Sequence, residues 1–245
     1  MRKTLRFLLV VFGLLIIASV AFIVWGETPA KPMPQALAAL QSDSQVTVNS
    51  GKWLVFSPAA AIPSTGFIIY PGGRVDYRAY APQAHALAAQ GYLVVIVPMP
   101  LNLAVLHPNA ASEVIDAHQE INVWAVGGHS LGGAMAANYV NAHRSSVRGL
   151  ILWASYPASS DDLSLSDLKV ITISGTADGL STPAKIEDSL ALLPPDTTRV
   201  IIQGGNHAQF GWYGHQAGDN PATISREVQF TQIVRATAAF LSTLK

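Results

Sequence analysis

The expected fold is decided by the stretch Trp124-Ala125-Val126-Gly127-Gly128-His129-Ser130-Leu131-Gly132-Gly133. It begins with apolar residues of strand length and runs into an alanine-rich segment with helical spacing. Gly128 and Gly132 flank Ser130 two residues away on each side, in a G-x-S-x-G pattern. Glycines at these positions let the backbone turn sharply and let a helix approach a strand closely. The stretch therefore predicts a strand, a tight turn and a helix, with the Ser130 hydroxyl presented at the strand's C-terminal end.

Apolar runs of strand length alternate with segments of helical spacing along the rest of the chain. Most of the strand-length runs are continuously apolar, which is typical of strands covered on both faces. The predicted strands are 46–48, 53–57, 66–70, 93–97, 124–128, 150–154, 170–174 and 200–203. The predicted helices are 80–90, 110–118, 131–141, 183–193 and 225–244. This order predicts an α/β fold: a mostly parallel twisted sheet of about eight strands with helices on both faces.

Composition excludes several classes of protein. The 245 residues include no cysteine, which excludes a disulfide scaffold, cysteine-ligated zinc and a cysteine nucleophile. Lys and Arg (15) balance Asp and Glu (15), which argues against a partner such as nucleic acid. His85, His107, His118 and His143 have no partner at metal-ligand spacing, so no metal is expected, and no cofactor motif is present.

The N-terminus predicts a membrane segment. Residues 7–26 carry no charge and follow Arg2, Lys3 and Arg6. Twenty helical residues span about 30 Å, the thickness of a bilayer's hydrocarbon core. We expect residues 1–26 to form a signal anchor with its N-terminus in the cytoplasm and the rest of the chain outside. The alternative is a cleaved signal peptide and secretion, with Ser19-Val20-Ala21 as a loose cleavage site, although the run exceeds the usual length of about 7 to 15 residues.

The remainder divides into a short segment and one domain. Residues 27–34 contain three prolines and predict a stiff spacer. The domain is expected to cover 35–245. Only residues 155–168 lie between the sixth and seventh predicted strands, too few for a large cap domain. We therefore expect loops 99–109 and 208–224 to cover the site, which favours short acyl or lactone substrates.

A serine nucleophile needs a base and an orienting carboxylate, in the chain order Ser, Asp, His for this kind of turn. Asp178 follows the predicted strand 170–174, and His207 follows 200–203. Parallel strands gather the loops after their C-terminal ends at one edge of the sheet. We expect Ser130, Asp178 and His207 to form a catalytic triad, with Asp162 and His215 as the fallback acid and base.

Attack by the serine puts negative charge on the substrate oxygen, and backbone N–H groups must donate hydrogen bonds to that oxygen. One expected donor is the amide of Leu131. The second is the amide of Gly73, in the loop Pro71-Gly72-Gly73-Arg74 after the strand 66–70, with Arg74 as the second choice. The alternative is that Gly72 and Gly73 only form a tight turn.

Five stretches resemble an α/β-hydrolase of the dienelactone-hydrolase-like group, the bacterial family often labelled α/β-hydrolase fold-5. They are Tyr70–Asp76, Val97–Pro100, Gly127–Gly133, Trp153–Pro157 and Gly204–Phe210. The resemblance implies a hydrolase with a Ser-Asp-His triad, mapped onto Ser130, Asp178 and His207. Dienelactone hydrolases use a cysteine nucleophile, and Ser130 departs from that pattern, so the resemblance does not imply dienelactone as the substrate.

These inferences predict a membrane-anchored serine hydrolase that cleaves a small ester, lactone or related acyl compound through an acyl-enzyme. Its expected partners are the small-molecule acyl substrate and, through residues 7–26, a membrane. Two alternatives remain open: a catalytically silent binding module at the cell surface, and an acyltransferase that uses the same triad. The sequence leaves the oligomeric state open.

Overall fold

The computed structural model describes residues 2–244. Within them, eight strands form one sheet in the order β1-β2-β4-β3-β5-β6-β7-β8. Only β1 with β2 and β2 with β4 pair antiparallel, and all other neighbours are parallel. The strands are β1 Val46–Ser50, β2 Leu54–Pro58, β3 Thr65–Tyr70, β4 Leu93–Ile96, β5 Val123–His129, β6 Gly149–Trp153, β7 Lys169–Gly175 and β8 Thr198–Ile202. The predicted α/β class and mostly parallel sheet are confirmed.

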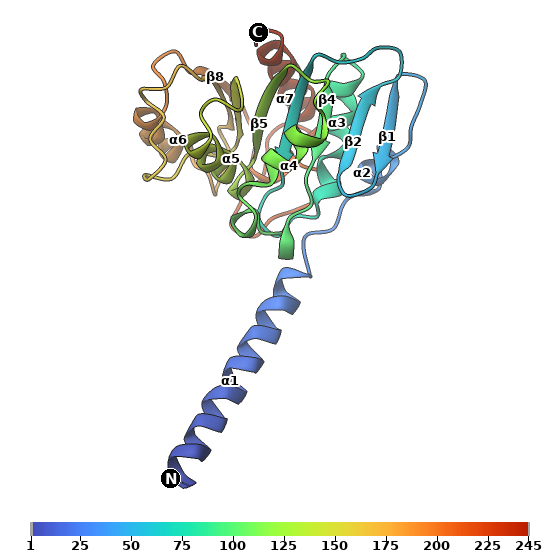
Figure 1. The fold of residues 1–245 in the computed structure, drawn as a ribbon. Helices are drawn as coiled ribbons and strands as arrows, with labels where there is room; N and C mark the ends of the chain where they lie inside the picture. Colours follow the sequence, from blue (N-terminus) through green and yellow to red (C-terminus); the bar gives the residue numbers. More distant parts are fainter. Residues whose placement is uncertain (1, 245) are drawn as a thin grey trace.

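Helices cover the sheet on both faces (Figure 1). Helices α3 and α7 pack on one face, and α4 and α5 pack on the other. The helices are α1 Arg2–Gly26, α2 Pro34–Ala38, α3 Ala81–Ala88, α4 Ala110–Ala117, α5 Leu131–Ala142, α6 Pro183–Ser189 and α7 Arg226–Leu241. The short helix α2 was not predicted, and α6 is shorter than expected because its last turn, Leu190–Leu192, tightens to a 3-10 helix.

Strand β3 shows why the apolar runs are continuous. Its residues Phe67, Ile68, Ile69 and Tyr70 are all fully buried. Phe67 and Ile69 belong to the core under α3 and α7, whereas Ile68 and Tyr70 belong to the core under α4 and α5. Successive side chains of a strand point to opposite faces, so a strand covered on both sides needs an apolar residue at every position.

The glycines around Ser130 allow the close approach that the motif predicted. A Cβ atom added at Gly128 or at Gly132 would lie 2.1 Å from the carbonyl oxygen of Tyr70. No side chain fits at that distance. Helix α5 and strand β5 therefore both pack against the C-terminal end of β3 at its backbone.

No cap covers the sheet between β6 and β7. Residues 155–168 contain neither helix nor strand. A site at the C-terminal ends of these strands is therefore bounded by loops, as the shortness of residues 155–168 predicted.

Helix α1 extends away from the rest of the chain (Figure 1). Its span Thr4–Gly26 has 23 residues, and the most apolar 18-residue stretch of it has a mean hydropathy of 3.1 and no buried residue. By length and composition this helix could cross a membrane as an anchor, or it could be a signal sequence.

The segment predicted as a spacer lies along the domain. The Ala30 N–H donates to the carbonyl of Arg74 (2.8 Å), and the Asp76 N–H donates to the carbonyl of Ala30 (3.0 Å). The Met33 N–H donates to the carbonyl of Trp212 (2.7 Å). These bonds satisfy backbone groups that a free spacer would leave to water. Part of the segment 27–34 is thus hydrogen-bonded to the domain that follows it.

Candidate active site

Ser130 occupies a strained turn between β5 and α5. Its φ is 53° and its ψ is −123°, a conformation that residues with a side chain rarely adopt. The Ser130 N–H donates to the carbonyl of Trp153 (3.0 Å), and the Ser155 hydroxyl donates to the carbonyl of Ser130 (2.6 Å). The flanking strand β6 and the loop after it therefore hold this turn in place.

Backbone strain is concentrated at one edge of the sheet. Among residues 2–244, the non-glycine residues with positive φ are Arg74, Leu101, Asn102, Ser130 and Ala154. They follow the C-terminal ends of β3, β4, β5 and β6. Strained residues of this kind persist where the surrounding structure holds them, and they cluster at functional sites. We call this edge the catalytic edge.

Asp178 and His207 meet at the same edge. The distance from His207 Nδ1 to Asp178 Oδ2 is 2.8 Å, and both side chains are fully buried. The other carboxylate oxygen, Oδ1, accepts from the N–H groups of Leu180 (2.8 Å) and Ser181 (2.7 Å). The carboxylate is thus fixed in orientation, and it favours the tautomer in which Nδ1 carries the proton.

That tautomer leaves Nε2 of His207 as a base. Nε2 is buried and has no hydrogen-bond partner within the part of the chain that the structure describes, and no hydrogen bond joins it to Ser130 there. Catalytic hydrogen bonds are often long in the absence of substrate and shorten in the substrate complex. The unpartnered nitrogen can therefore accept a proton from a group that enters the site.

One further carboxylate ties the two loops together. Asp219 Oδ1 accepts from the N–H groups of Gly179 (3.0 Å) and His207 (3.3 Å), and Oδ2 accepts from the N–H of Ala208 (2.8 Å). Gly179 directly follows Asp178, so Asp219 bridges the loop of Asp178 and the loop of His207. Sequence reasoning missed this residue, because Asp in Gly218-Asp219-Asn220-Pro221 has the composition of an ordinary turn.

A second histidine lies against the first. The ring centroids of His129 and His207 are 4.4 Å apart. His129 Nδ1 lies 2.9 Å from the hydroxyl of Tyr80, which accepts from the Gly72 N–H (3.0 Å). Burial raises the pKa of Tyr80, so its hydroxyl stays protonated and can donate a hydrogen bond to His129 Nδ1. Burial, followed by the neighbouring His207, holds the pKa of His129 well below its usual range, so this ring stays neutral.

The two amides expected to donate to an oxyanion are both without an acceptor in the described residues. Neither the Gly73 N–H nor the Leu131 N–H has an acceptor among residues 2–244, and a Cβ at Gly73 would lie 3.1 Å from Leu131 Cδ2. The Arg74 N–H, the second choice, donates to the carbonyl of Asn102 (2.8 Å) and is therefore occupied. The geometry favours Gly73 over Arg74.

A small cavity of about 270 Å³ opens beside Ser130. It is lined by Ser130, Leu131, Ala134, Ser155, Tyr156 and Ser181. These residues come from the turn after β5, the first turns of α5 and the loops after β6 and β7, whereas the loops 99–109 and 208–224, which we expected to cover the site, do not line it. Its volume falls at the lower end of ordinary ligand pockets, about 300 to 1,000 Å³.

The remaining acid and base candidates lie elsewhere. Asp161 is buried and accepts from the side-chain amides of Asn138 (3.0 Å) and Asn141 (3.4 Å). Asp162 and His215 are exposed, and no hydrogen bond joins either to the triad residues within 2–244. In the same described part of the chain, no cluster of three or more His, Asp or Glu side chains could hold a metal ion.

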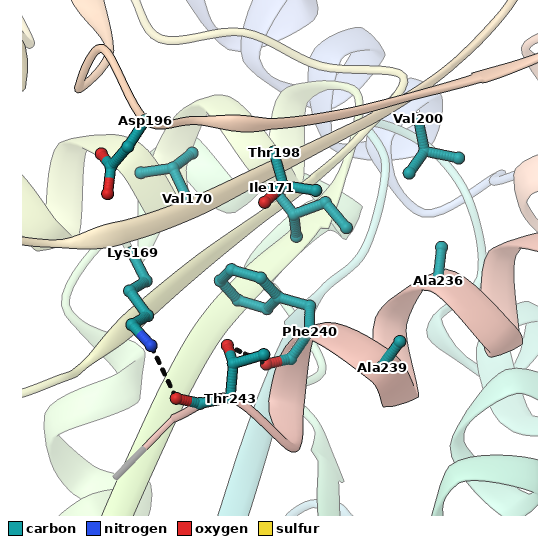
Figure 2. A pocket seen from close by; sticks show the side chains of 10 residues that line it. All are labelled: Lys169, Val170, Ile171, Asp196, Thr198, Val200, Ala236, Ala239, Phe240 and Thr243. Atoms are coloured by element: carbon teal, nitrogen blue, oxygen red, sulfur yellow. Dashed lines mark hydrogen bonds between the residues drawn. The ribbon is translucent and has the colours of Figure 1, made fainter.

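Another cavity, of about 430 Å³, lies at the opposite edge (Figure 2). It is bounded by the first residues of β7 and β8 and by the end of α7. Lys169 at its rim donates to the carbonyl of Thr243 (2.7 Å), as Figure 2 shows. Its walls are mostly aliphatic, and it contains no nucleophile paired with a base.

Comparison with solved structures shows the same fold in esterases. The native form of an esterase from the Planctomycetes species Thermogutta terrifontis, Est2, has 13% sequence identity and a TM-score of 0.59, over 80% of this chain and 91% of that one. Its butyrate-bound form has 13% identity and a TM-score of 0.59, over 81% and 94%. The esterase domain of a Rhodothermus marinus protein has 13% identity and a TM-score of 0.61, over 78% and 92%.

Sequence comparison supplies the family. No curated protein sequence matches the chain. A family model described as the alpha/beta hydrolase family matches residues 66–231, which extend from β3 into α7 and include Ser130, Asp178 and His207. Since this match covers more than half of the chain, and the fold is that of carboxylic ester hydrolase-like enzymes, the protein belongs to the alpha/beta hydrolase family.

Proposed function

We propose that this protein is a membrane-anchored serine hydrolase that cleaves a small ester, lactone or related acyl compound. The observation that carries the proposal is the buried Asp178–His207 pair, whose Nδ1 to Oδ2 distance is 2.8 Å. His207, with its unpartnered Nε2, and the strained Ser130 both follow strands that end at the catalytic edge. A buried ion-pairing carboxylate, a histidine with one free nitrogen and a serine on a sharp turn are the parts that acyl transfer through a serine needs.

In the proposed reaction, Ser130 Oγ passes its proton to His207 Nε2 and attacks the carbonyl carbon of the substrate. The N–H groups of Gly73 and Leu131 donate to the oxygen that becomes negative. Collapse of this intermediate breaks the ester bond, and the departing alcohol takes the proton from His207. Water then attacks the acyl-enzyme with His207 as base, and the acid leaves as Ser130 Oγ recovers its proton.

The size of the acyl group follows from the cavity beside Ser130. A volume of about 270 Å³ favours a short acyl chain over a long one. Butyrate is bound in one structure of the Thermogutta terrifontis esterase, which has the same fold. We expect higher kcat/KM for acetyl and butyryl esters than for palmitoyl esters; a preference for palmitoyl would contradict this acyl pocket.

The anchor rests on the length and apolar character of α1. With Arg2, Lys3 and Arg6 on the cytoplasmic side, the domain lies outside the cytoplasm. Alkaline carbonate should leave the protein in the membrane pellet, and protease added to spheroplasts should digest the domain. Recovery of a soluble form that begins after residue 21 would instead show a cleaved signal peptide.

Labelling with a fluorophosphonate tests the nucleophile. The wild type should be labelled and Ser130→Ala should not, because only an activated serine reacts with this probe. Ser242→Ala, an exposed serine at the end of α7, is the matched control and should be labelled like the wild type. Labelling of Ser130→Ala would assign the nucleophile to another residue.

A further inference from the structure

The end of α1 is docked on the catalytic edge. Arg74 Nε donates to the carbonyl of Trp25 (3.0 Å), and Arg74 Nη2 donates to the carbonyl of Thr28 (2.8 Å). The Asn102 side-chain amide donates to the carbonyl of Gly26 (3.0 Å). The Arg74 guanidinium lies over the Trp25 ring, 4.3 Å from its centroid. The carbonyls of Trp25 and Gly26 belong to the last turn of α1, which has no partners for them within the helix backbone, and Thr28 follows two residues later.

The contacts leave no room between helix and domain. Gly26 is buried, and a Cβ there would lie 2.7 Å from Leu101 Cβ. Leu101 and Asn102 follow β4, and Arg74 follows β3 directly after Gly73. The helix therefore leaves the domain from the edge that carries Ser130, Asp178 and His207, and it points away from that edge (Figure 1).

The length of α1 determines where the catalytic edge lies relative to the hydrocarbon core of the membrane. The 23 residues of Thr4–Gly26 span about 34 Å at about 1.5 Å per residue, against about 30 Å for the hydrocarbon core. Tryptophan near the end of such a span is typical of the membrane–water interface. A fully inserted α1 therefore places Trp25, and the loops docked on it, at the level of the lipid headgroups.

Two exposed apolar side chains occupy the same region. Val105 is 51% exposed and Leu106 is 47% exposed, a few residues after the docked Leu101. They belong to the short 3-10 helix Ala104–Leu106, which packs against α5, the helix that follows Ser130. We call Val105 and Leu106 the rim pair. Apolar side chains beside a membrane span can enter the interface without exposing apolar area to water.

We infer that the catalytic edge faces the membrane surface and that the substrate is an amphiphile held at that surface, with a short acyl group on an apolar alcohol. The inference rests on the proposed hydrolase and its anchor, and it adds the place from which substrate arrives. The small cavity accepts only the acyl group, while the apolar alcohol stays in the lipid. Anchoring enzyme and substrate in one surface raises their effective concentration.

The position of the edge can be tested without activity. The chain has no cysteine, so a single fluorescent label can be placed at will. Leu106→Cys and Ile62→Cys, each in the full chain in phosphatidylcholine vesicles, form a matched pair. Ile62 is 86% exposed and lies before β3, at the opposite edge of the sheet. Lipids with a nitroxide on the headgroup should quench the label at 106 and not the label at 62. Equal quenching at the two positions would overturn the inference.

Two butyryl esters test whether the substrate comes from the membrane: hexadecyl butyrate, which stays in vesicles, and ethyl butyrate, which dissolves in water. Hexadecyl butyrate in the same vesicles as the enzyme should be cleaved at least about tenfold faster than hexadecyl butyrate in separate vesicles. Replacing the rim pair in Val105→Ser/Leu106→Ser should reduce this advantage, while hydrolysis of dissolved ethyl butyrate stays within about twofold, because the rim pair does not line the cavity beside Ser130. Ile62→Ser should leave both rates at the wild-type value.

The outcomes separate the two proposals. Equal rates on hexadecyl butyrate in shared and separate vesicles would overturn the membrane source of the substrate, even with full activity on ethyl butyrate. Quenching at 106 together with no hydrolysis of any ester by the wild type would overturn the hydrolase, and would support the orientation of the edge alone.

Discussion

The two sides of Ser130 are built differently. On the side of the base, Asp178, His207 and Asp219 are joined by hydrogen bonds that stay within the domain. On the side of the oxyanion, Gly73 precedes Arg74, whose guanidinium is bonded to the end of α1. The base is therefore positioned by the domain alone, whereas the loop that contributes Gly73 is also positioned by the N-terminal helix.

Because of this difference, changes in α1 should affect the loop of Gly73 and Arg74 but not the Asp178–His207 pair. Arg74 has a φ of 55°, which is costly for a residue with a side chain, and its bonds to Trp25 and Thr28 help to offset that cost. Loss of α1 would remove part of that support and leave the Asp178–His207 pair unchanged.

The largest effect is expected on the side of the base. His207→Ala should lower kcat about 10⁶-fold and Asp178→Asn about 10⁴-fold, as in other serine hydrolases. In Asp178→Asn, Oδ1 can still accept from Leu180 and Ser181, which leaves the amide NH2 facing His207 Nδ1. That arrangement forces the proton onto Nε2 and removes the base. Steady-state hydrolysis of p-nitrophenyl butyrate measures both; unchanged activity in either would transfer the role to His215 or Asp162.

Asp219→Asn should have an intermediate effect. The remaining oxygen can still accept from Gly179 and His207, but the amide NH2 then faces the N–H of Ala208, so that bond is lost and the His207 loop is displaced. Misplacement of the base by about 1 Å can cost about 100-fold in kcat/KM. Asp162→Asn, an exposed carboxylate away from the triad, is the control and should keep wild-type kinetics. A wild-type rate for Asp219→Asn would show that the loops position themselves without it.

A smaller effect is expected where the oxyanion loop meets α1. Arg74→Ala should lower kcat about tenfold, since the Gly73 amide is then less well oriented. Arg74→Lys should not restore the rate, because an ammonium cannot donate to two carbonyls in the same plane and stack on Trp25. Removal of residues 2–26 should lower kcat to a similar extent, and the two changes combined should cost less than their sum. Full additivity would show that Arg74 acts independently of the helix.

The smallest effect concerns pH and His129. The pKa of this ring is held below 6.5 in the folded protein, so the unfolded chain binds the extra proton first as pH falls. Its contribution to stability is complete above pH 6.5 and is lost on acidification, by about 1.4 kcal/mol per pH unit for one proton. His129→Asn keeps an acceptor for Tyr80 and removes the titrating ring. Melting temperatures at several pH values should therefore fall less steeply for this variant; an unchanged slope would assign the proton elsewhere.

Much of the fold could be predicted from short segments. The G-x-S-x-G turn, the strands on either side and the order of Ser130, Asp178 and His207 depend on local chemistry: glycines where Tyr70 crowds the backbone, and apolar runs that need cover on both faces. The choice of Gly73 over Arg74 as oxyanion donor stays a prediction, and the bond of the Arg74 N–H to the Asn102 carbonyl supports it. The strand boundaries moved by only a few residues.

Other features depended on long-range contacts. Residues 27–34 look like a spacer because prolines suit an extended chain, but only the folded loop after β3 supplies the Arg74 carbonyl that binds Ala30. The cavity beside Ser130 is formed by the start of α5 together with the loops after β6 and β7, and loop length alone indicated 99–109 and 208–224. Nothing in the local sequence around Asp219 or Tyr80 distinguishes them from a turn residue or a core aromatic.

The sequence by itself determined the individual strand and helix segments, the sharp turn at Ser130 and the apolar N-terminal helix, because each is specified by residues within one or two dozen positions of each other. Only the tertiary structure decided that α1 is docked on the catalytic edge, that Asp219 joins the loops of acid and base, and that His129 packs on His207. These contacts join segments far apart in the chain, and their energy depends on distances and angles that exist only once the sheet has formed.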